Sequence, residues 1–151
     1  MWLFLVQSGP TARLRFVRSP KFGPFVQLAK RTCLRPLTYI LQTLVILPDD
    51  ADASVLDIQT IVVHEGLPLM LRADLLDNCT GARKMIIAIA ALAHYDVNHP
   101  ALIRAGATKQ LQRLMKVTYF DGHARCPTAE EHGDMLLIAK CTLERLQSSL
   151  Q

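Results

Sequence analysis

The sequence predicts an all-α fold, and three observations carry this prediction. Apolar residues recur at intervals of three and four in several stretches, which is the spacing of one helix face. Prolines and glycines divide these stretches into short segments. In addition, residues 58–77 and 96–116 share one pattern, a short apolar segment, a glycine and a longer amphipathic segment, with Gly66 and Gly106 in equivalent positions. The two glycines are 40 residues apart. Internal similarity at a spacing of about 20–50 residues is typical of stacked helical units.

The first 23 residues form a basic segment in which we expect no regular element. Bulky apolar side chains alternate irregularly with arginines there, without a sustained helical or strand period. We therefore predict that residues 1–23 are poorly ordered. As an alternative, the acid-free stretch TARLRFVRS resembles a mitochondrial presequence.

Two helices are predicted before residue 48. Pro24 is suited to the first turn of a short helix, and Pro36 to the start of a second one. The second helix carries an apolar stripe that ends at Pro48, because a proline interrupts the backbone hydrogen bonds of a helix. The stripe consists of Leu37, Ile40, Leu41, Leu44, Val45 and Leu47.

The middle of the chain predicts three helices. A short one over 55–65 ends at Gly66, where a left-handed backbone conformation turns the chain into a second helix over 67–76. After a polar break, 82–95 reads ARKMIIAIAALAHY and is apolar nearly all round. A helix without a polar face is buried on several sides.

The last part of the chain repeats this order with one interruption. A helix over 98–105 turns at Gly106 into a helix over 108–117, and a long insertion, 118–133, follows. Asp134 is then expected to cap the final helix.

This order of helices resembles the armadillo repeat. The resemblance is carried by VVHEGLPLML, LIRAGATKQLQRLM and AIAALAHYDVNHPALIRAG. It implies a right-handed superhelix of about three repeats over 24–150. The first repeat would be degenerate and lack its first helix, and the third would be interrupted by a loop. It also implies that the chain binds another protein or a peptide.

Members of the family that bind extended peptides carry asparagines on successive third helices, and this sequence departs from that pattern. The matching positions hold Thr43, Ala91 and Thr142. We therefore leave the mode of binding open. The candidate groove residues lie on the polar edges of the predicted third helices, and they are Thr43, Arg83, Lys84, Lys140 and Glu144.

Charge and cysteine content limit the other functions. The first 48 residues carry seven basic and no acidic side chains, whereas the remainder carries 10 basic against 13 acidic ones. No nucleic-acid motif accompanies the basic start, so nucleic acid is not the predicted partner. The four cysteines are widely spaced, which indicates reduced thiols in a reducing compartment. The apolar runs are too short for a transmembrane helix.

Catalytic and metal sites are not predicted. His123, Cys126 and His132 are ligand types for zinc, but a structural site needs a fourth ligand and their spacing fits no zinc motif. His64, His94 and His99 fall near predicted helix ends, where an imidazole can bond a terminal carbonyl. We expect no cofactor and no enzymatic activity.

Together these observations predict a protein-binding or assembly scaffold that acts in the cytoplasm or nucleus. A small mitochondrial protein delivered by its basic start is the alternative. Self-association of the chain is a further alternative to binding a different partner, because half of the residues are hydrophobic.

Overall fold

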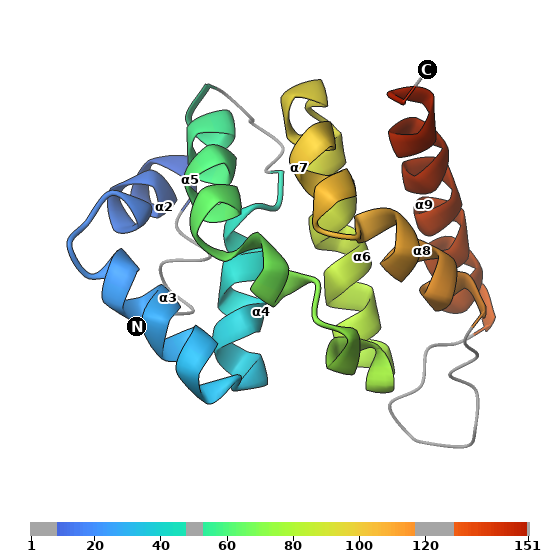
Figure 1. The fold of residues 1–151 in the computed structure, drawn as a ribbon, viewed down its shortest axis with the longest axis horizontal. Helices are drawn as coiled ribbons and strands as arrows, with labels where there is room; N and C mark the ends of the chain where they lie inside the picture. The colour runs from blue at the N-terminus through green and yellow to red at the C-terminus, as the bar shows by residue number, and fades with distance from the viewer. Residues whose placement is uncertain (1–8, 48–52, 117–128, 151) are drawn as a thin grey trace. The chain divides into compact units, whose positions relative to one another are not determined.

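The computed structural model describes residues 9–47, 53–116 and 129–150, and all their regular elements are helices (Figure 1). No strand occurs within these ranges. The all-α prediction is therefore confirmed for the described chain. The chain forms two compact units, Met1–Met70 and Leu71–Gln151, each of which has its own buried residues.

The described residues of the first unit form four helices. They are α2 (Pro10–Val17), α3 (Phe22–Thr32), α4 (Arg35–Leu44) and α5 (Ala53–Met70). Both α2 and α4 pack against α5. Prolines lie in the first turns of α2 and α4, where a missing backbone N–H costs nothing.

The helix α2 corrects the prediction that 1–23 lacks regular structure, as far as residues 10–23 are concerned. Only its last two residues, Phe16 and Val17, are buried, so its sequence carries little helical periodicity. Phe16 lies edge-on to Phe22 and Phe25, with ring centroids 5.5 and 5.8 Å away. Aromatic pairs in this geometry add about 0.5–1.5 kcal/mol beyond the area they bury. Tertiary packing thus holds a helix that its own pattern does not predict.

An arginine also joins α2 to the end of α4. The Nη1 atom of Arg13 donates a hydrogen bond to the backbone oxygen of Ile46 at 3.2 Å. Partial burial lowers the pKa of the Arg13 guanidinium from its ordinary value. The first unit therefore includes this part of the basic segment.

Gly66 is not a turn, and this prediction is wrong. It lies inside α5, a single helix, and its φ is not positive. Instead, a Cβ atom built on Gly66 would lie 3.3 Å from Cδ1 of Leu41, so glycine permits close packing of α5 on α4. Pro68 lies two residues further on and removes a backbone hydrogen bond, which bends a helix. Figure 1 shows the last turns of α5 running in a different direction from the first.

In the second unit, the part of the chain that the structure describes forms two short 3-10 helices and four α-helices. They are η1 (Ala73–Asp77), α6 (Cys79–Ala93), η2 (Asp96–Asn98), α7 (His99–Arg104), α8 (Ala107–Lys116) and α9 (Ala129–Ser148). Asn78 caps α6, because its Oδ1 accepts a hydrogen bond from the Gly81 N–H at 2.7 Å. The polar break before α6 therefore begins the helix as well as ending the preceding segment.

The helix α6 is buried on several sides, as predicted. Its buried residues include Met85, Ile86, Ile89 and Leu92, together with the small residues Ala88 and Ala91. Among the described residues, no single helix is both long and apolar enough to cross a membrane. Within the same residues, α6 and Asp96–Arg104 reach the required length and apolar composition only when taken together, and a bend of 114° separates them.

Gly106 turns the chain between α7 and α8, as predicted. Its φ is +88°, in the region that glycine adopts without steric cost. The start of the last helix differs from the prediction, because α9 begins at Ala129 and Asp134 lies inside it. Asp134 is therefore not its cap. The insertion is shorter than expected, and its residues 118–128 lie outside the described chain.

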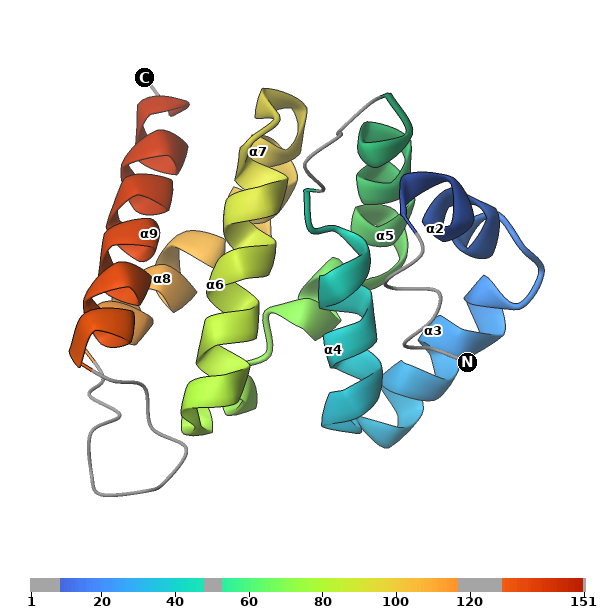
Figure 2. The same ribbon diagram turned by 180° about the vertical axis from the view of Figure 1, so that it is seen from behind.

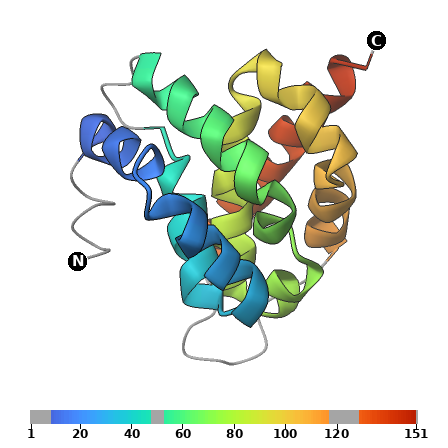
Figure 3. The ribbon, with the colours of Figure 1, turned by 60° about the vertical axis from the view of Figure 1, so that its left-hand side comes forward.

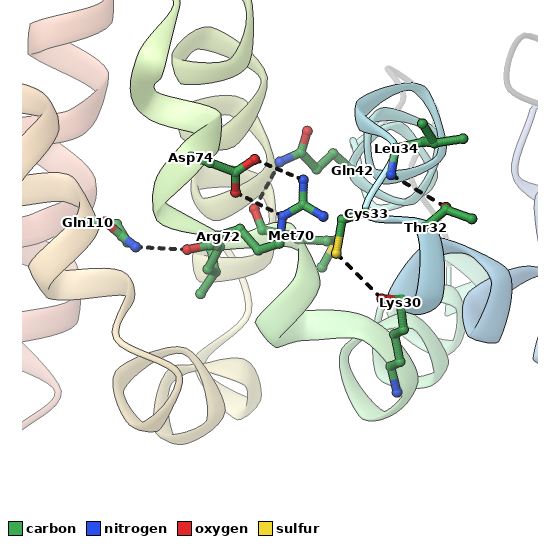
Figure 4. Close-up of polar contacts among 10 residues, drawn as sticks. Lys30, Thr32, Cys33, Leu34, Gln42, Met70, Arg72, Asp74 and Gln110 are labelled. Carbon is green, nitrogen blue, oxygen red and sulfur yellow. Dashed lines mark hydrogen bonds and ion pairs between the residues drawn. The ribbon is translucent and has the colours of Figure 1, made fainter.

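Buried amides satisfy the carbonyls at the helix ends of the first unit. The last four carbonyls of a helix have no partner within the helix. The Nε2 atom of Gln59 donates to the Val45 oxygen at the end of α4, at 2.9 Å. The Nε2 atom of Gln42 donates to the Met70 oxygen at the end of α5, also at 2.9 Å (Figure 4). Both glutamines are almost fully buried.

The second unit uses the same device where α6 ends. Asn98 donates from Nδ2 to the Leu92 oxygen at 3.0 Å, and His99 Nε2 bonds the Ala93 oxygen at 2.6 Å. A further amide of this unit, Gln110 of α8, donates to the backbone oxygen of Leu71 at 2.8 Å (Figure 4). Asn98 and His99 thus satisfy two carbonyls of the last turn of α6.

Candidate functional site

The helices α6 and α9 form the framework of the candidate site. They pack side by side and run in the same direction, as Figure 2 shows. Along α9, Met135, Ala139, Thr142 and Leu146 are buried. Because these residues recur at intervals of three and four, they occupy one face and leave the opposite face exposed.

A cleft of about 210 Å³ lies between the N-terminal parts of α6 and α9. Its apolar lining consists of Ile86, Ile87, Met135 and Ile138, and its charged lining of Arg83, Glu131 and Asp134. Ile138 is 39% exposed, and the neighbouring Leu137 is 60% exposed. An apolar floor with a charged rim is the usual composition of a protein-binding surface.

A second and wider groove runs between α7 and the C-terminal half of α9. Its volume is about 990 Å³, and it includes Glu144, His99 and Cys141. Both charge signs line it, through Asp96, Glu144, Arg104 and Arg145. Such a mixed lining does not select a cation or an anion.

The groove places a histidine and a cysteine together, which the sequence did not predict. His99 is 3% exposed, and its Nε2 bonds the Ala93 oxygen, so this nitrogen has a structural role. Within the described residues, Nδ1 of His99 is buried without a hydrogen-bond partner. Cys141 lies exposed on α9. For Cys141 to act as a nucleophile, a base would have to lie within hydrogen-bonding reach of it. We assign His99 a structural role instead, because its bond to the Ala93 oxygen orients the ring.

Within the second unit, the predicted groove residues do not line one groove. Arg83 lines the smaller cleft and Glu144 the wider groove, whereas Lys84 and Lys140 line neither. Thr43 belongs to the first unit, where its hydroxyl donates to the Tyr39 oxygen of its own helix at 2.7 Å. Sequence position on the polar edges of α6 and α9 is therefore not enough to predict a shared surface.

In the second unit, the two positions that match the family's asparagines are buried and are not available to a ligand. Ala91 is 7% exposed and Thr142 is 6% exposed. Backbone recognition by a ladder requires polar side chains on an open face. The departure noted in the sequence thus coincides with burial of these positions.

Of the three candidate zinc ligands, His132 alone lies within the residues that the structure describes. His123 and Cys126 lie outside the described residues. His132 lies half-buried in α9. Within the described ranges, no three histidine, cysteine or acidic residues gather as a metal site would require.

The three helix-end histidines differ in their roles. The prediction is confirmed for His99, which bonds a carbonyl of the last turn of α6. His94 follows α6 directly, and its ring lies edge-on to that of Tyr95, with centroids 5.0 Å apart. His64 lies inside the continuous helix α5, so its predicted place at a helix end is wrong.

The apolar floor of the cleft was not predicted from the sequence. Arg83 and Ile87 are four residues apart, as are Asp134 and Ile138, so each pair shares one helix face. In each pair, an apolar residue follows a charged residue by one helical turn. This pattern could have indicated an apolar surface beside the charged edge of each helix.

No family model, curated protein or solved structure matches this chain.

Proposed function

We propose that this protein is a non-enzymatic protein-binding module and that the cleft between α6 and α9 receives an apolar side chain of the partner. The observation that carries this proposal is the exposure of Ile138 and Leu137 beside a cleft whose floor is apolar. Apolar contact area of this kind supplies most of the binding energy of an interface, while a charged rim supplies orientation.

An armadillo-like arrangement is part of this proposal. The chain order supports it, because α2 and α3 precede α4, the single bent helix α5 precedes α6, and α7 and α8 precede α9. The third helices α4, α6 and α9 would then follow one another along a right-handed superhelix. A repeat of this kind is stabilised mainly by its neighbouring repeats, so the last helix of the array keeps an exposed apolar face.

The proposed site of action is the cytoplasm or nucleus. A cleaved presequence covering 1–23 is not favoured, because Phe16 and Val17 are buried and Arg13 bonds Ile46. Removal of this segment would take α2 away from α5. Microscopy of a C-terminally tagged chain tests the location, and enrichment in mitochondria would favour the alternative.

Affinity capture with two matched variants tests the binding proposal. Ile138→Asp places a charge beside the apolar floor, whereas Lys116→Asp changes an exposed residue of α8. We expect mass spectrometry to find partner proteins retained by the wild type and by Lys116→Asp, and lost with Ile138→Asp. If Ile138→Asp retains the same proteins, or if the partner is a second copy of the chain, the proposal of a separate partner at this cleft is wrong.

A further inference from the structure

A second exposed surface lies in the first unit, on the outer side of α3. We define the α3 face as Pro24, Gln27, Leu28, Lys30, Arg31 and Leu34. All six residues are exposed, and Leu28 and Leu34 are 41% and 55% exposed. A shallow groove of about 570 Å³ is lined by four of them, Pro24, Gln27, Lys30 and Arg31.

The sequence of α3 fixes which side faces outward. Phe22, Phe25, Val26 and Ala29 are buried, and they lie on the opposite side of the helix. Figure 3 shows α3 on the side of the first unit turned toward the viewer. The two leucines of the α3 face are therefore additional to the core that α3 already contributes.

The turn after α3 holds Leu34 at the end of this face. Cys33 has a left-handed backbone, and its Sγ donates to the Lys30 oxygen at 3.5 Å (Figure 4). The hydroxyl of Thr32 donates to the Leu28 oxygen at 2.8 Å and accepts from the Leu34 N–H at 3.4 Å. These local bonds order the segment before α4 begins, so binding does not have to order it.

The α3 face is strongly basic. No aspartate or glutamate occurs from Pro10 to Leu44. Arg13 bonds a backbone carbonyl, and Arg18 lies 3.5 Å from Asp57 of α5. In contrast, the side chains of Lys30 and Arg31 form no ion pair within the described residues. Their positive field stays open to an external anion.

We propose that the α3 face binds a segment of a partner protein in which carboxylate and aliphatic side chains are interspersed. The cations match the carboxylates, and the two exposed leucines match the aliphatic groups. All three phenylalanines of α2 and α3 are buried, so this surface offers no platform for stacking nucleotide bases. Its two leucines are flanked by charges, whereas insertion into a lipid surface needs a continuous apolar face. This inference does not depend on the α6–α9 cleft.

Fluorescence anisotropy with a labelled peptide of glutamate and leucine, repeated as Glu-Glu-Leu-Leu, tests this proposal. We expect the wild type to bind it more weakly as salt is raised. Reversing both charges, in Lys30→Glu with Arg31→Glu, should weaken binding at least about tenfold, because attraction becomes repulsion. The neutral pair Lys30→Gln with Arg31→Gln should lose less and leaves the helix end less perturbed.

The matched control is the pair Lys109→Glu with Arg113→Glu, which makes the same charge change on exposed residues of α8. It should bind the peptide within about twofold of wild type. Replacement of Leu28 and Leu34 by serine should weaken binding without changing its dependence on salt.

Three results would overturn the proposal. The first is equal loss in the α3 and α8 pairs, which would indicate attraction by net charge alone. The second is tighter binding, dependent on Lys30 and Arg31, to single-stranded RNA or to phosphatidylserine vesicles than to the peptide. The third is failure of the correctly folded wild type to bind the peptide. Loss at the α3 pair alone supports the proposal.

Discussion

Cys33 adopts a conformation that suits glycine better than cysteine. Its φ is +52°, and residues with a Cβ reach this region at a cost of about 1–2 kcal/mol. We predict that Cys33→Gly raises the free energy of unfolding by about 0.5–1 kcal/mol, since part of the gain is offset by the entropy of glycine in the unfolded chain. Chemical denaturation measures this change.

The same substitution at Cys141 is the control. Cys141 is exposed within the helix α9, where glycine is a poor helix former. Cys141→Gly should therefore lower the free energy of unfolding, by up to about 1 kcal/mol. Equal signs for the two variants would contradict the conformational explanation.

Gly106 and Gly66 should respond differently to asparagine. Gly106 has positive φ and open space around it, so asparagine, which tolerates this conformation, should cost little. At Gly66 an asparagine would place an amide beside Leu41 in the core, at a cost of about 1–3 kcal/mol or more. Thermal unfolding should show a clear loss only for Gly66→Asn. Equal losses would mean that the two glycines share one role.

Residue-level prediction succeeded where a local rule was sufficient. Gly106 followed from the turn it makes between two amphipathic segments, and His99 followed from its place after a helix. Gly66 has the same sequence context as Gly106, but contact with Leu41 decides its role. That contact involves residues far apart in the chain and is absent from any local pattern.

At the scale of the elements, buried amides define the helix ends. Gln59 is fully buried and donates to the Val45 oxygen. We predict that Gln59→Leu lowers the free energy of unfolding by about 1–3 kcal/mol, because it leaves a buried carbonyl without a partner. At this chain length, each kcal/mol lowers the thermal midpoint by roughly 2–4 °C.

Gln147→Leu provides the comparison, because Gln147 is exposed near the end of α9. It should change the free energy of unfolding by less than about 0.5 kcal/mol. If Gln59→Leu is as mild as Gln147→Leu, the hydrogen bond to Val45 contributes nothing to the end of α4.

The sequence predicted the elements unevenly, for physical reasons. α4 followed from its apolar stripe, and α6 followed from a stretch that is apolar nearly all round. α2 did not, because only two of its residues are buried. The sequence predicted two helices in place of α5, because glycine and proline usually end helices. In the structure, Gly66 permits close packing and Pro68 lies at a bend, so the helix continues through both residues. Gln59 itself lies among Val55, Ile58 and Val62 on one helix face, and a polar residue in such a stripe was a usable signal.

At the scale of the whole molecule, composition and periodicity were sufficient to predict an all-α protein. The candidate site was harder, since Arg83 and Glu144 line different grooves and the apolar floor of the cleft was not predicted. A cleft depends on which faces of two helices remain uncovered, and this requires knowledge of their packing. The second unit therefore supplies a more specific binding hypothesis than the sequence did.

Site-specific photo-crosslinking tests the proposed binding role most directly. A photoreactive benzoyl-phenylalanine would replace Ile138 in one variant and the exposed Lys109 of α8 in another. We predict that illumination in cell extract joins a distinct partner polypeptide to the position 138 variant and not to the position 109 variant. Identical cross-linking at both positions, or none at position 138 in correctly folded protein, would contradict the proposal that the α6–α9 cleft binds another protein.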